Sequence, residues 1–535
     1  MAGLATTFGS GAMTNPINDI VNHVEMMLVI GSNPTEAHPV IGYKMRQAAR
    51  NGAKLVVCDP RHIDLVDEAD VWLRQKPGTD IPLLNGLMHI IIKEGLEDKK
   101  FVEERTENYE ELKEIVDTYT PERVAEITGL AVDDLYKVAR MYATTDKATI
   151  YYTLGITEHI CGTRNVMSVA NLAMLTGHLG RHGTGVCPMR GQNNVQGACD
   201  MGALPNVFTG YQAVGNEDAR AKFENAWGVS LPAKVGLKIP EMFEAAHEGK
   251  VKAMYILGEN PVLTDPDANH IRASLANLDF LVVQELFLTE TAEYADVVLP
   301  AASFAECDGT FTNTERRVQR VRKAIDPLPG QANWETICQM ATRMGYPMSY
   351  NHPGEIWDEM ASLTPSMAGI NYARIDVTGL HWPCPAPDHP GTPVLHSGKF
   401  TRGLGLFQPS EHIPPGEMPD EEYPFLLSTG RILYHYNVTT PYSRGIYSIW
   451  NKERAEINPV DAERLGLVTG SQVKVTSRRG EAVTEVTVTD RVLPGVIWMS
   501  FHYNATPTNA LTSHHLDPIT GTGEYKVAAV KVEKI

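Results

Sequence analysis

The segment 185–205 (GVCPMRGQNNVQGACDMGALP) gathers side chains that suit a polar ligand. It holds one cation, Arg190, and four neutral amides, Gln192, Asn193, Asn194 and Gln196. Because the segment has neither a helical nor an alternating apolar period, the sequence predicts an ordered loop. A guanidinium presents a planar fork of donors that matches a carboxylate, so the lone arginine suits a small planar anion. The alternatives are an ordinary surface loop and, for Arg190, an ordinary salt bridge.

Length and composition indicate a globular protein of several domains. The 535 residues correspond to roughly three or four domains at ~100–200 residues each. The formal charge of −18 argues against a nucleic-acid partner. The seven cysteines form no C-x-x-C pair, so no zinc or iron–sulfur motif is recognisable and reducing surroundings are indicated. Cys187 and Cys199 are interpreted as buried small residues.

No apolar run approaches the ~20 residues that a membrane span needs, and no signal peptide is visible after Met1. The sequence therefore predicts a cytoplasmic protein, with a signal on a preceding segment left open.

The elements ahead of the loop predict a βαβ unit. Strands are expected at 26–30 and 54–60, with a helix at 39–49 between them, so ligand-facing residues are expected where the strands end. The residues near these ends are Asn33, Glu36, Asp59 and Arg61. A further helix is expected after Pro77-Gly78-Thr79-Asp80, and Asp59 and Asp80 are alternatively plain helix caps or turn residues.

The same order of motifs recurs later in the chain. MYILGENP (254–261) matches MLVIGSNP (27–34), and LVVQE (281–285) matches LVVCD (55–59). Asp296 of YADVVLP and Asp70 of EADVWL are 226 positions apart, and the glycines of the first pair of motifs, Gly258 and Gly31, are 227 positions apart. A constant offset across three segments indicates two related α/β halves, which predicts two similar ligand moieties or one ligand with two nucleotide arms.

Between these halves the apolar residues have helical spacing, which predicts helices. The C-terminal part instead shows a connector followed by short strands. Residues 383–421 are rich in proline and glycine and predict a connector. From Tyr423 onward, short strands alternate with turns, interrupted by one helix at 458–467, which predicts a closed β-barrel.

Taken together, these segments resemble the molybdopterin-guanine-dinucleotide oxidoreductase family, and within it the large catalytic subunit of formate dehydrogenases. The most specific part is RGQNNVQGACDMGALP (190–205), supported by GSNPTEAHP, CDPR, PGTD, GENP, GTFTNTERRVQ and STGRILYHYNVTT (428–440). The resemblance implies an α/β fold similar to formate dehydrogenase and DMSO reductase, with two related dinucleotide-binding α/β halves and a C-terminal dinucleotide-binding β-barrel. The expected domains are 1–190, 191–382, a connector at 383–421, and 422–535.

The resemblance also implies a cofactor, a molybdenum or tungsten ion held by two pterin-guanine dinucleotides, and residues to hold it. One arm would be held by Asn33, Glu36, Asp59, Arg61, Gly78 and Asp80. The other would be held by Gly258, Asn260, Thr264 and Gln284. The barrel would contribute Arg431, His435, Asn509, Tyr525 and Lys526. His435 is alternatively a packed barrel histidine.

Two residues are implied in catalysis, Arg190 and Gln192. Arg190 would bind formate, and a bidentate guanidinium would fix the C–H bond of formate during its oxidation to carbon dioxide or the reverse. Gly191 and Gln192 would approach the pterin. Glu158 would do so as well, at a position where the family commonly has glutamine. The implied partners are electron-transfer subunits of iron–sulfur, flavin or hydrogenase type.

The chain lacks the cysteine motif for a [4Fe–4S] cluster and the cysteine or selenocysteine that the family places before AGLATTFGSGAMTNP. We therefore assign no metal ligand here and expect the cluster only in a missing N-terminal segment. An in-frame UGA codon for selenocysteine, read as a stop, would explain such a truncation, and this chain alone would then be inactive. Alternatives are a family member that acts on nitrate, thiosulfate or polysulfide, and a non-catalytic subunit as in respiratory complex I.

Overall fold

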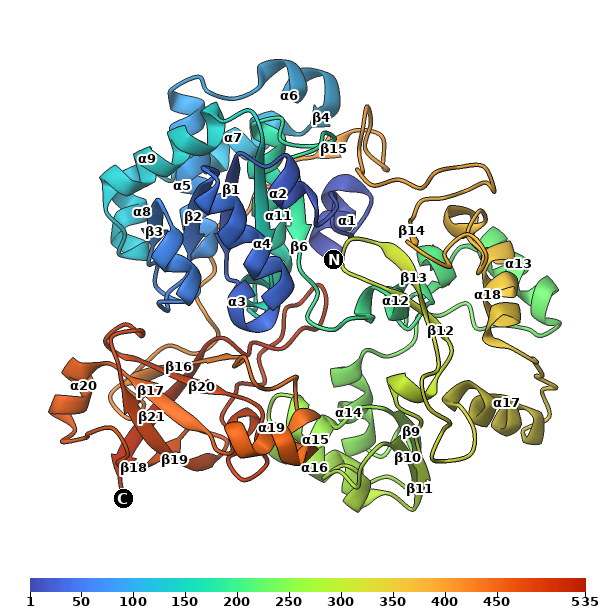
Figure 1. The fold of residues 1–535 in the computed structure, drawn as a ribbon. Helices are drawn as coiled ribbons and strands as arrows, with labels where there is room; N and C mark the ends of the chain where they lie inside the picture. Colours follow the sequence, from blue (N-terminus) through green and yellow to red (C-terminus); the bar gives the residue numbers. More distant parts are fainter. The chain divides into compact units, whose positions relative to one another are not determined.

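The computed structural model describes residues 1–535 (Figure 1). The chain forms two compact units, which we name unit 1 and unit 2. Unit 1 comprises Met1–Met189, Pro261–His270 and Val394–Ile535. Unit 2 comprises Arg190–Asn260 and Ile271–Pro393.

Unit 1 contains a five-stranded parallel sheet in the order β3-β2-β1-β5-β6. Its strands are β1 (Met26–Ile30), β2 (Lys54–Cys58), β3 (Val71–Leu73), β5 (Ala148–Tyr152) and β6 (Gly185–Pro188). The helices are α1 (Ala2–Phe8), α2 (Asp19–Asn22), α3 (Pro34–Ala37), α4 (Pro39–Arg50), α5 (Asp80–Lys93), α6 (Lys99–Arg105), α7 (Tyr109–Asp117), α8 (Pro121–Thr128), α9 (Val132–Thr144), α10 (Leu154–Thr157) and α11 (Gly162–Leu175). The predicted βαβ unit and the helical region after it are therefore confirmed.

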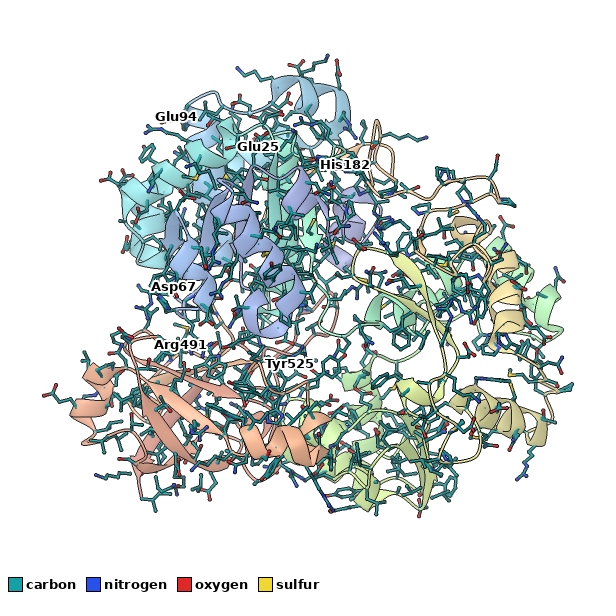
Figure 2. The ribbon with its side chains drawn as sticks, viewed as in Figure 1. Glu25, Asp67, Glu94, His182, Arg491 and Tyr525 are labelled. Carbon is teal, nitrogen blue, oxygen red and sulfur yellow. The ribbon has the colours of Figure 1, made fainter.

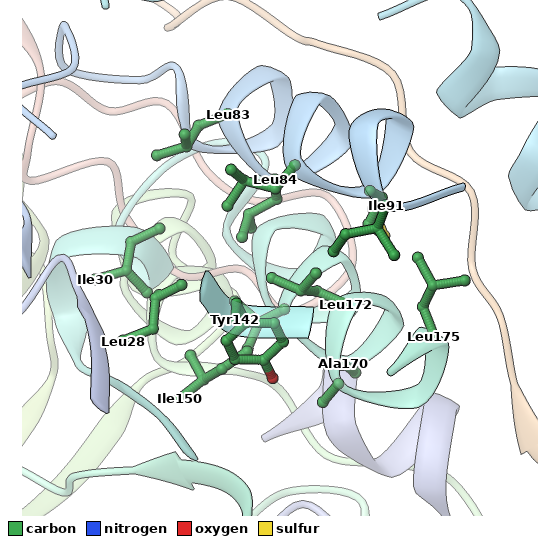
Figure 3. Close-up of a cluster of buried hydrophobic side chains, with 14 of the residues drawn as sticks. Leu28, Ile30, Leu83, Leu84, Ile91, Tyr142, Ile150, Ala170, Leu172 and Leu175 are labelled. Carbon is green, nitrogen blue, oxygen red and sulfur yellow. The ribbon is translucent and has the colours of Figure 1, made fainter. Parts of the chain in front are cut away.

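The sheet is covered on both faces, because successive side chains of a strand point to opposite sides. Leu28 and Ile30 pack with α5, α9 and α11, as Figure 3 shows for Leu83, Tyr142 and Leu172. The intervening residues of β1 pack against α4 in a second apolar cluster. Strands buried on both faces carry continuous apolar runs, which explains why MMLVI showed no alternation in the sequence.

The prediction of a loop over residues 185–205 is wrong in part. It begins with β6, which pairs with β5, and it contains the helix α12 (Val195–Asp200). The buried side of α12 consists of Gln196, Gly197, Cys199 and Asp200, so it has no apolar stripe that a periodicity search could detect.

Unit 2 repeats part of the sheet of unit 1. Its parallel strands β9 (Ala253–Leu257), β10 (Phe280–Glu285) and β11 (Val297–Pro300) are ordered β11-β10-β9, as β3-β2-β1 are. Asp70 Oδ2 accepts a hydrogen bond from the backbone N–H of Leu55 at 2.8 Å, and Asp296 Oδ2 accepts one from Leu281 at 2.7 Å.

The turns after β1 and β9 match as well. The N–H of Gly31 donates to the carbonyl of Cys58 at 3.0 Å, and that of Gly258 donates to Gln284 at 2.9 Å. Both glycines have positive φ, 54° and 65°, a conformation that other residues rarely adopt. The two related α/β halves are thus confirmed at the level of individual hydrogen bonds.

The remainder of unit 2 is a small antiparallel sheet with flanking helices. Its strands are β12 (Gly309–Thr312), β13 (Arg317–Val321) and β14 (Leu380–His381). The longer helices are α13 (Glu217–Trp227), α14 (Ile239–His247), α17 (Asn333–Arg343) and α18 (Pro353–Leu363).

The C-terminal part of unit 1 is a closed barrel with the strand order β16-β20-β17-β19-β18-β21. The strands are β16 (Phe425–Gly430), β17 (Arg454–Ile457), β18 (Gln472–Thr476), β19 (Glu481–Val488), β20 (Val496–Ser500) and β21 (Ala528–Lys534). Alternate apolar side chains such as Leu427, Val475 and Met499 fill its core. The predicted barrel is confirmed, and α20 (Pro459–Arg464) is the predicted helix within it.

No helix of the structure combines the length and the apolar character needed to cross a membrane.

Glu453, next to β17, is a buried carboxyl group within the barrel. It accepts hydrogen bonds from the N–H of Ser500 at 2.9 Å, the N–H of Arg454 at 3.1 Å and the Ser500 hydroxyl. Burial is the main cause that raises the pKa of Glu453 to about 7. Folding therefore favours the protonated acid.

We expect Glu453→Gln to be more stable, relative to the wild-type protein, at pH 8 than at pH 5. Between about pH 4.5 and 7 the folded state keeps a proton that the unfolded state has lost, so the wild-type chain loses about 3 kcal/mol as the pH rises. Glutamine stays neutral and escapes this loss. Thermal unfolding at both pH values measures the difference, with the exposed Glu481→Gln as control, and an identical shift at both pH values would contradict the prediction.

Candidate functional site

In unit 1, charged residues meet beyond the ends of β1 and β2. Arg61 donates from Nε and Nη2 to the two carboxylate oxygens of Glu456 at 2.7 and 2.6 Å, and its guanidinium lies 3.9 Å from the centre of the Trp498 ring. Glu36 Oε2 is 3.8 Å from Arg61 Nη1, and its other oxygen is 3.6 Å from Arg491. Two of the predicted residues, Glu36 and Arg61, are therefore brought together with a barrel carboxylate.

Asp59, which is half-buried, and Asp80, which is buried, are carboxyl groups near this cluster. Asp59 Oδ1 accepts a hydrogen bond from the backbone N–H of Arg61 at 2.9 Å, and Asp80 Oδ1 lies 3.3 Å from Gln75 Nε2. Burial raises the pKa of Asp59 to about 7 and also raises the pKa of Asp80. Gly78 has a φ of +79°, and a Cβ atom there would lie 2.5 Å from Pro415. The predicted glycine is therefore required by the backbone.

Glu158 and Lys526 form an ion pair, with Oε2 and Nζ 2.8 Å apart. Lys526 Nζ also donates to the carbonyl of Thr429 at 3.1 Å, and the Thr429 hydroxyl donates to the carbonyl of Tyr525 at 2.9 Å. Glu158 thus contacts a cation of the barrel segment.

Asn509 lies against the segment 261–270. Its Nδ2 donates to the carbonyls of Leu263 at 2.9 Å and Thr264 at 3.0 Å, which brings together two of the predicted residues. Asn509 Oδ1 is buried and accepts no hydrogen bond within the protein. An unsatisfied buried acceptor is costly, so this oxygen suits a donor on a ligand.

The remaining residues in unit 1 have partners within the protein. His435 is buried, with Nδ1 3.0 Å from the Thr440 hydroxyl and Nε2 2.8 Å from the carbonyl of Trp450. Arg431 donates to the side-chain oxygen of Asn437. Asn33 Oδ1 accepts from the Thr35 hydroxyl at 2.8 Å.

In unit 2, Arg190 is held from several sides. Its backbone N–H donates to the Thr314 hydroxyl at 2.9 Å, its Nη2 donates to Gln196 Oε1 at 3.0 Å, and its Nη1 lies 3.8 Å from Cys199 Sγ. Gln192 is exposed in the turn before α12. Cys199, and Cys187 in unit 1, are buried cysteines outside any disulfide, and their burial was predicted.

A network that the sequence did not predict lies behind Arg190. Gln196 Nε2 donates to Asp200 Oδ1 at 2.7 Å, and the Tyr211 hydroxyl donates to the same oxygen at 2.8 Å. Trp382 Nε1 donates to the other oxygen at 2.7 Å. Burial raises the pKa of Asp200 to about 6. Because the Gln196 amide nitrogen donates to the Asp200 carboxylate, its oxygen is directed toward Arg190. The guanidinium is therefore oriented by an amide that is itself held in place.

The second set of predicted residues lies at the ends of β9 and β10. Asn260 Nδ2 donates to Glu290 at 2.7 Å, and its Oδ1 accepts from the Thr291 hydroxyl at 2.7 Å. Gln284 accepts from the Tyr255 hydroxyl and lies 3.2 Å from Asn333. Gly258 precedes Asn260 in the turn that repeats Gly31-Ser32-Asn33.

The groups in unit 1 fit a guanine dinucleotide. The base offers ring and amino N–H donors. The carboxyl groups of Asp59 and Asp80 and the buried side-chain oxygens of Gln75 and Asn509 are acceptors. The oxygens of Gln75 and Asn509 accept no hydrogen bond within the protein, so a donor-rich base would satisfy acceptors of this kind.

A fold with two related α/β halves, a closed barrel and these polar strand ends is that of a dinucleotide-binding class of proteins. The family model described as "Molybdopterin oxidoreductase" matches residues 3–343, and that described as "Molydopterin dinucleotide binding domain" matches 425–529. The chain belongs to the molybdopterin oxidoreductase family, and the matched domains imply a molybdopterin dinucleotide cofactor.

Individual proteins with similar sequences or structures are known as well. The chain is 49% identical to "F420-dependent formate dehydrogenase 2 subunit alpha" of Methanococcus maripaludis, over 100% of this chain and 80% of the relative. It is 43% identical to "Formate dehydrogenase H" of Escherichia coli, over 100% of this chain and 76% of the relative. Acetylene hydratase from Pelobacter acetylenicus shares the fold, with a TM-score of 0.78 and 21% identity over 100% of this chain and 80% of that one.

Proposed function

We propose that this chain is the catalytic subunit of a formate dehydrogenase, which oxidises formate to carbon dioxide or runs the reverse reaction. The observation that carries this proposal is the identity of 43–49% to formate dehydrogenase subunits across 100% of this chain. The proposed cofactor is molybdenum or tungsten held by two pterin-guanine dinucleotides. When bound, it supplies the acceptor for the two electrons that formate releases with a proton.

In this proposal Arg190 binds the substrate. The carboxylate of formate is planar and carries one negative charge, so it accepts two parallel hydrogen bonds from a guanidinium. Gln196 accepts a hydrogen bond from Nη2 of Arg190, and Gln196 in turn donates to Asp200. The orientation of Arg190 is therefore set before the substrate binds. Gln192 and Gly191 follow directly in the chain and are proposed to bind substrate or pterin.

The dinucleotide arms are proposed to bind at the two sets of strand ends. In unit 1, Asp59, Asp80 and Asn509 offer acceptors to guanine, while Arg431 and Lys526 offer positive charge to the phosphates. In unit 2, Gly258, Asn260 and Gln284 occupy the equivalent turn and strand end. A role for Thr264 is proposed through the Asn509 contact. The partners that receive the electrons are proposed to be other subunits with redox centres.

The test is an assay of the protein purified from its native source. We expect formate-dependent reduction of an artificial dye and guanine dinucleotide among the released pterins. We expect no oxidation of reduced dye when nitrate, thiosulfate or polysulfide is added. Activity with nitrate but not with formate would favour the other enzymes of the family. Absence of any pterin would favour a non-catalytic subunit.

A further inference from the structure

A histidine–aspartate cluster lies in unit 1, apart from the strand ends described above. It consists of Asp19 at the start of α2, His23 directly after α2, and His182 in the turn before β6 (Figure 2 labels His182). One ligand atom from each residue lies within 4.8 Å of the other two. Asp19 Oδ1 is 2.8 Å from His182 Nδ1, and the two imidazole rings are 5.0 Å apart.

The carboxylate of this cluster is held in a fixed orientation. Asp19 is buried, and its Oδ2 accepts hydrogen bonds from Asn15 Nδ2 at 2.9 Å and from the backbone N–H of Gly183 at 3.0 Å. Asn15 is itself fixed, because it also donates to the carbonyl of Arg181 at 2.8 Å. Metal-binding carboxylates are commonly oriented by such outer hydrogen bonds, which leave the other oxygen directed to the ion.

We propose that Asp19, His23 and His182 bind a divalent transition metal, with Zn²⁺ the best match. Two imidazoles and one carboxylate are a standard zinc ligand set, and the fourth position is open to water. Ligands on a tetrahedral zinc stand about 3.3 Å apart, since each bond is about 2.0 Å long. The two histidines are exposed, so small rotations of their rings bring their nitrogens to this spacing.

The surrounding charges permit a cation at this position. The neighbouring cations Arg181 and Lys147 are paired with Asp146 at 2.9 Å and Glu25 at 3.6 Å, so neither competes for Asp19. A bound ion would join α2, which leads into β1, to the turn that leads into β6. The ion would therefore link the segments that precede the central strand β1 and the edge strand β6 of the five-stranded sheet.

The test is equilibrium dialysis of the purified protein against Zn²⁺, with zinc per chain measured by mass spectrometry. We expect one chelator-sensitive equivalent, with affinity lowered at least about tenfold in His23→Ala and in His182→Ala. His62→Ala is the matched control, because His62 faces a carboxylate, Asp67 at 3.5 Å, without a second histidine. Zinc is also expected to raise the unfolding temperature of the wild-type protein but not of His23→Ala.

Three results would overturn the proposal. They are the absence of a zinc equivalent that a chelator removes, zinc binding that His23→Ala leaves unchanged, and an equal loss in His62→Ala. His23→Ala is the decisive variant because His23 is exposed and its removal leaves the hydrogen bonds of Asp19 intact. Its circular dichroism and dye-reducing activity are therefore expected to match those of the wild-type protein.

Discussion

Arg190→Lys is expected to lower kcat/KM for formate by about 10²-fold or more. Lysine keeps the charge but presents a point donor, so it loses one of two parallel charge-assisted hydrogen bonds, each worth about 1.5–3 kcal/mol. It also loses the contact through which Gln196 orients the side chain at 3.0 Å. A steady-state assay with formate and an artificial electron acceptor measures the change.

A control variant and a rescue experiment distinguish loss of substrate binding from damage to the fold. Arg322→Lys is the control, because Arg322 is an exposed arginine of unit 2 that pairs with Asp376 at 2.6 Å. We expect this variant to retain wild-type kinetics. Guanidine added to Arg190→Ala, but not to Arg190→Lys, is expected to restore part of the activity by supplying the missing fork. An Arg190→Lys enzyme with unchanged kcat/KM would show that Arg190 does not bind the substrate.

Arg61→Met is expected to lower the unfolding temperature of protein made without the cofactor by about 3 °C or more. The guanidinium makes a bidentate contact with Glu456 and stacks on Trp498, and both charged side chains are almost fully buried. Its loss leaves the Glu456 carboxylate with only Arg491 at 3.7 Å. Removing one partner of a buried ion pair costs about 3 kcal/mol or more.

The double variant Arg61→Met/Glu456→Gln tests whether the pair causes this loss. With the carboxylate neutralised, no buried charge is left without its partner, so we expect the double variant to regain part of the stability lost in Arg61→Met. Unfolding followed by circular dichroism gives the coupling free energy from the four proteins. Strictly additive effects of the two single substitutions would contradict a paired role.

The sequence alone determined the architecture of this protein, because local patterns carry it. Apolar runs bounded by Gly31-Ser32-Asn33 and by Gly258-Glu259-Asn260 predicted the two halves, because both runs form strands of parallel sheets. In the first half the strand is buried on both faces of its sheet. Alternating strands predicted the barrel. The sequence also placed Arg190 outside regular structure, Asp59 after the end of a strand and Asp80 at the start of a helix, as the structure has them.

Only the tertiary structure decided which side chains share a site. The helix α12 escaped prediction because its buried face is polar. Its Asp200 accepts a hydrogen bond from Tyr211, 11 positions away, and another from Trp382, 182 positions away. Arg61 and Glu456 are separated by 395 positions, and Asp19 and His182 by 163. No local periodicity encodes these contacts, because chain folding alone brings such distant segments within hydrogen-bonding distance.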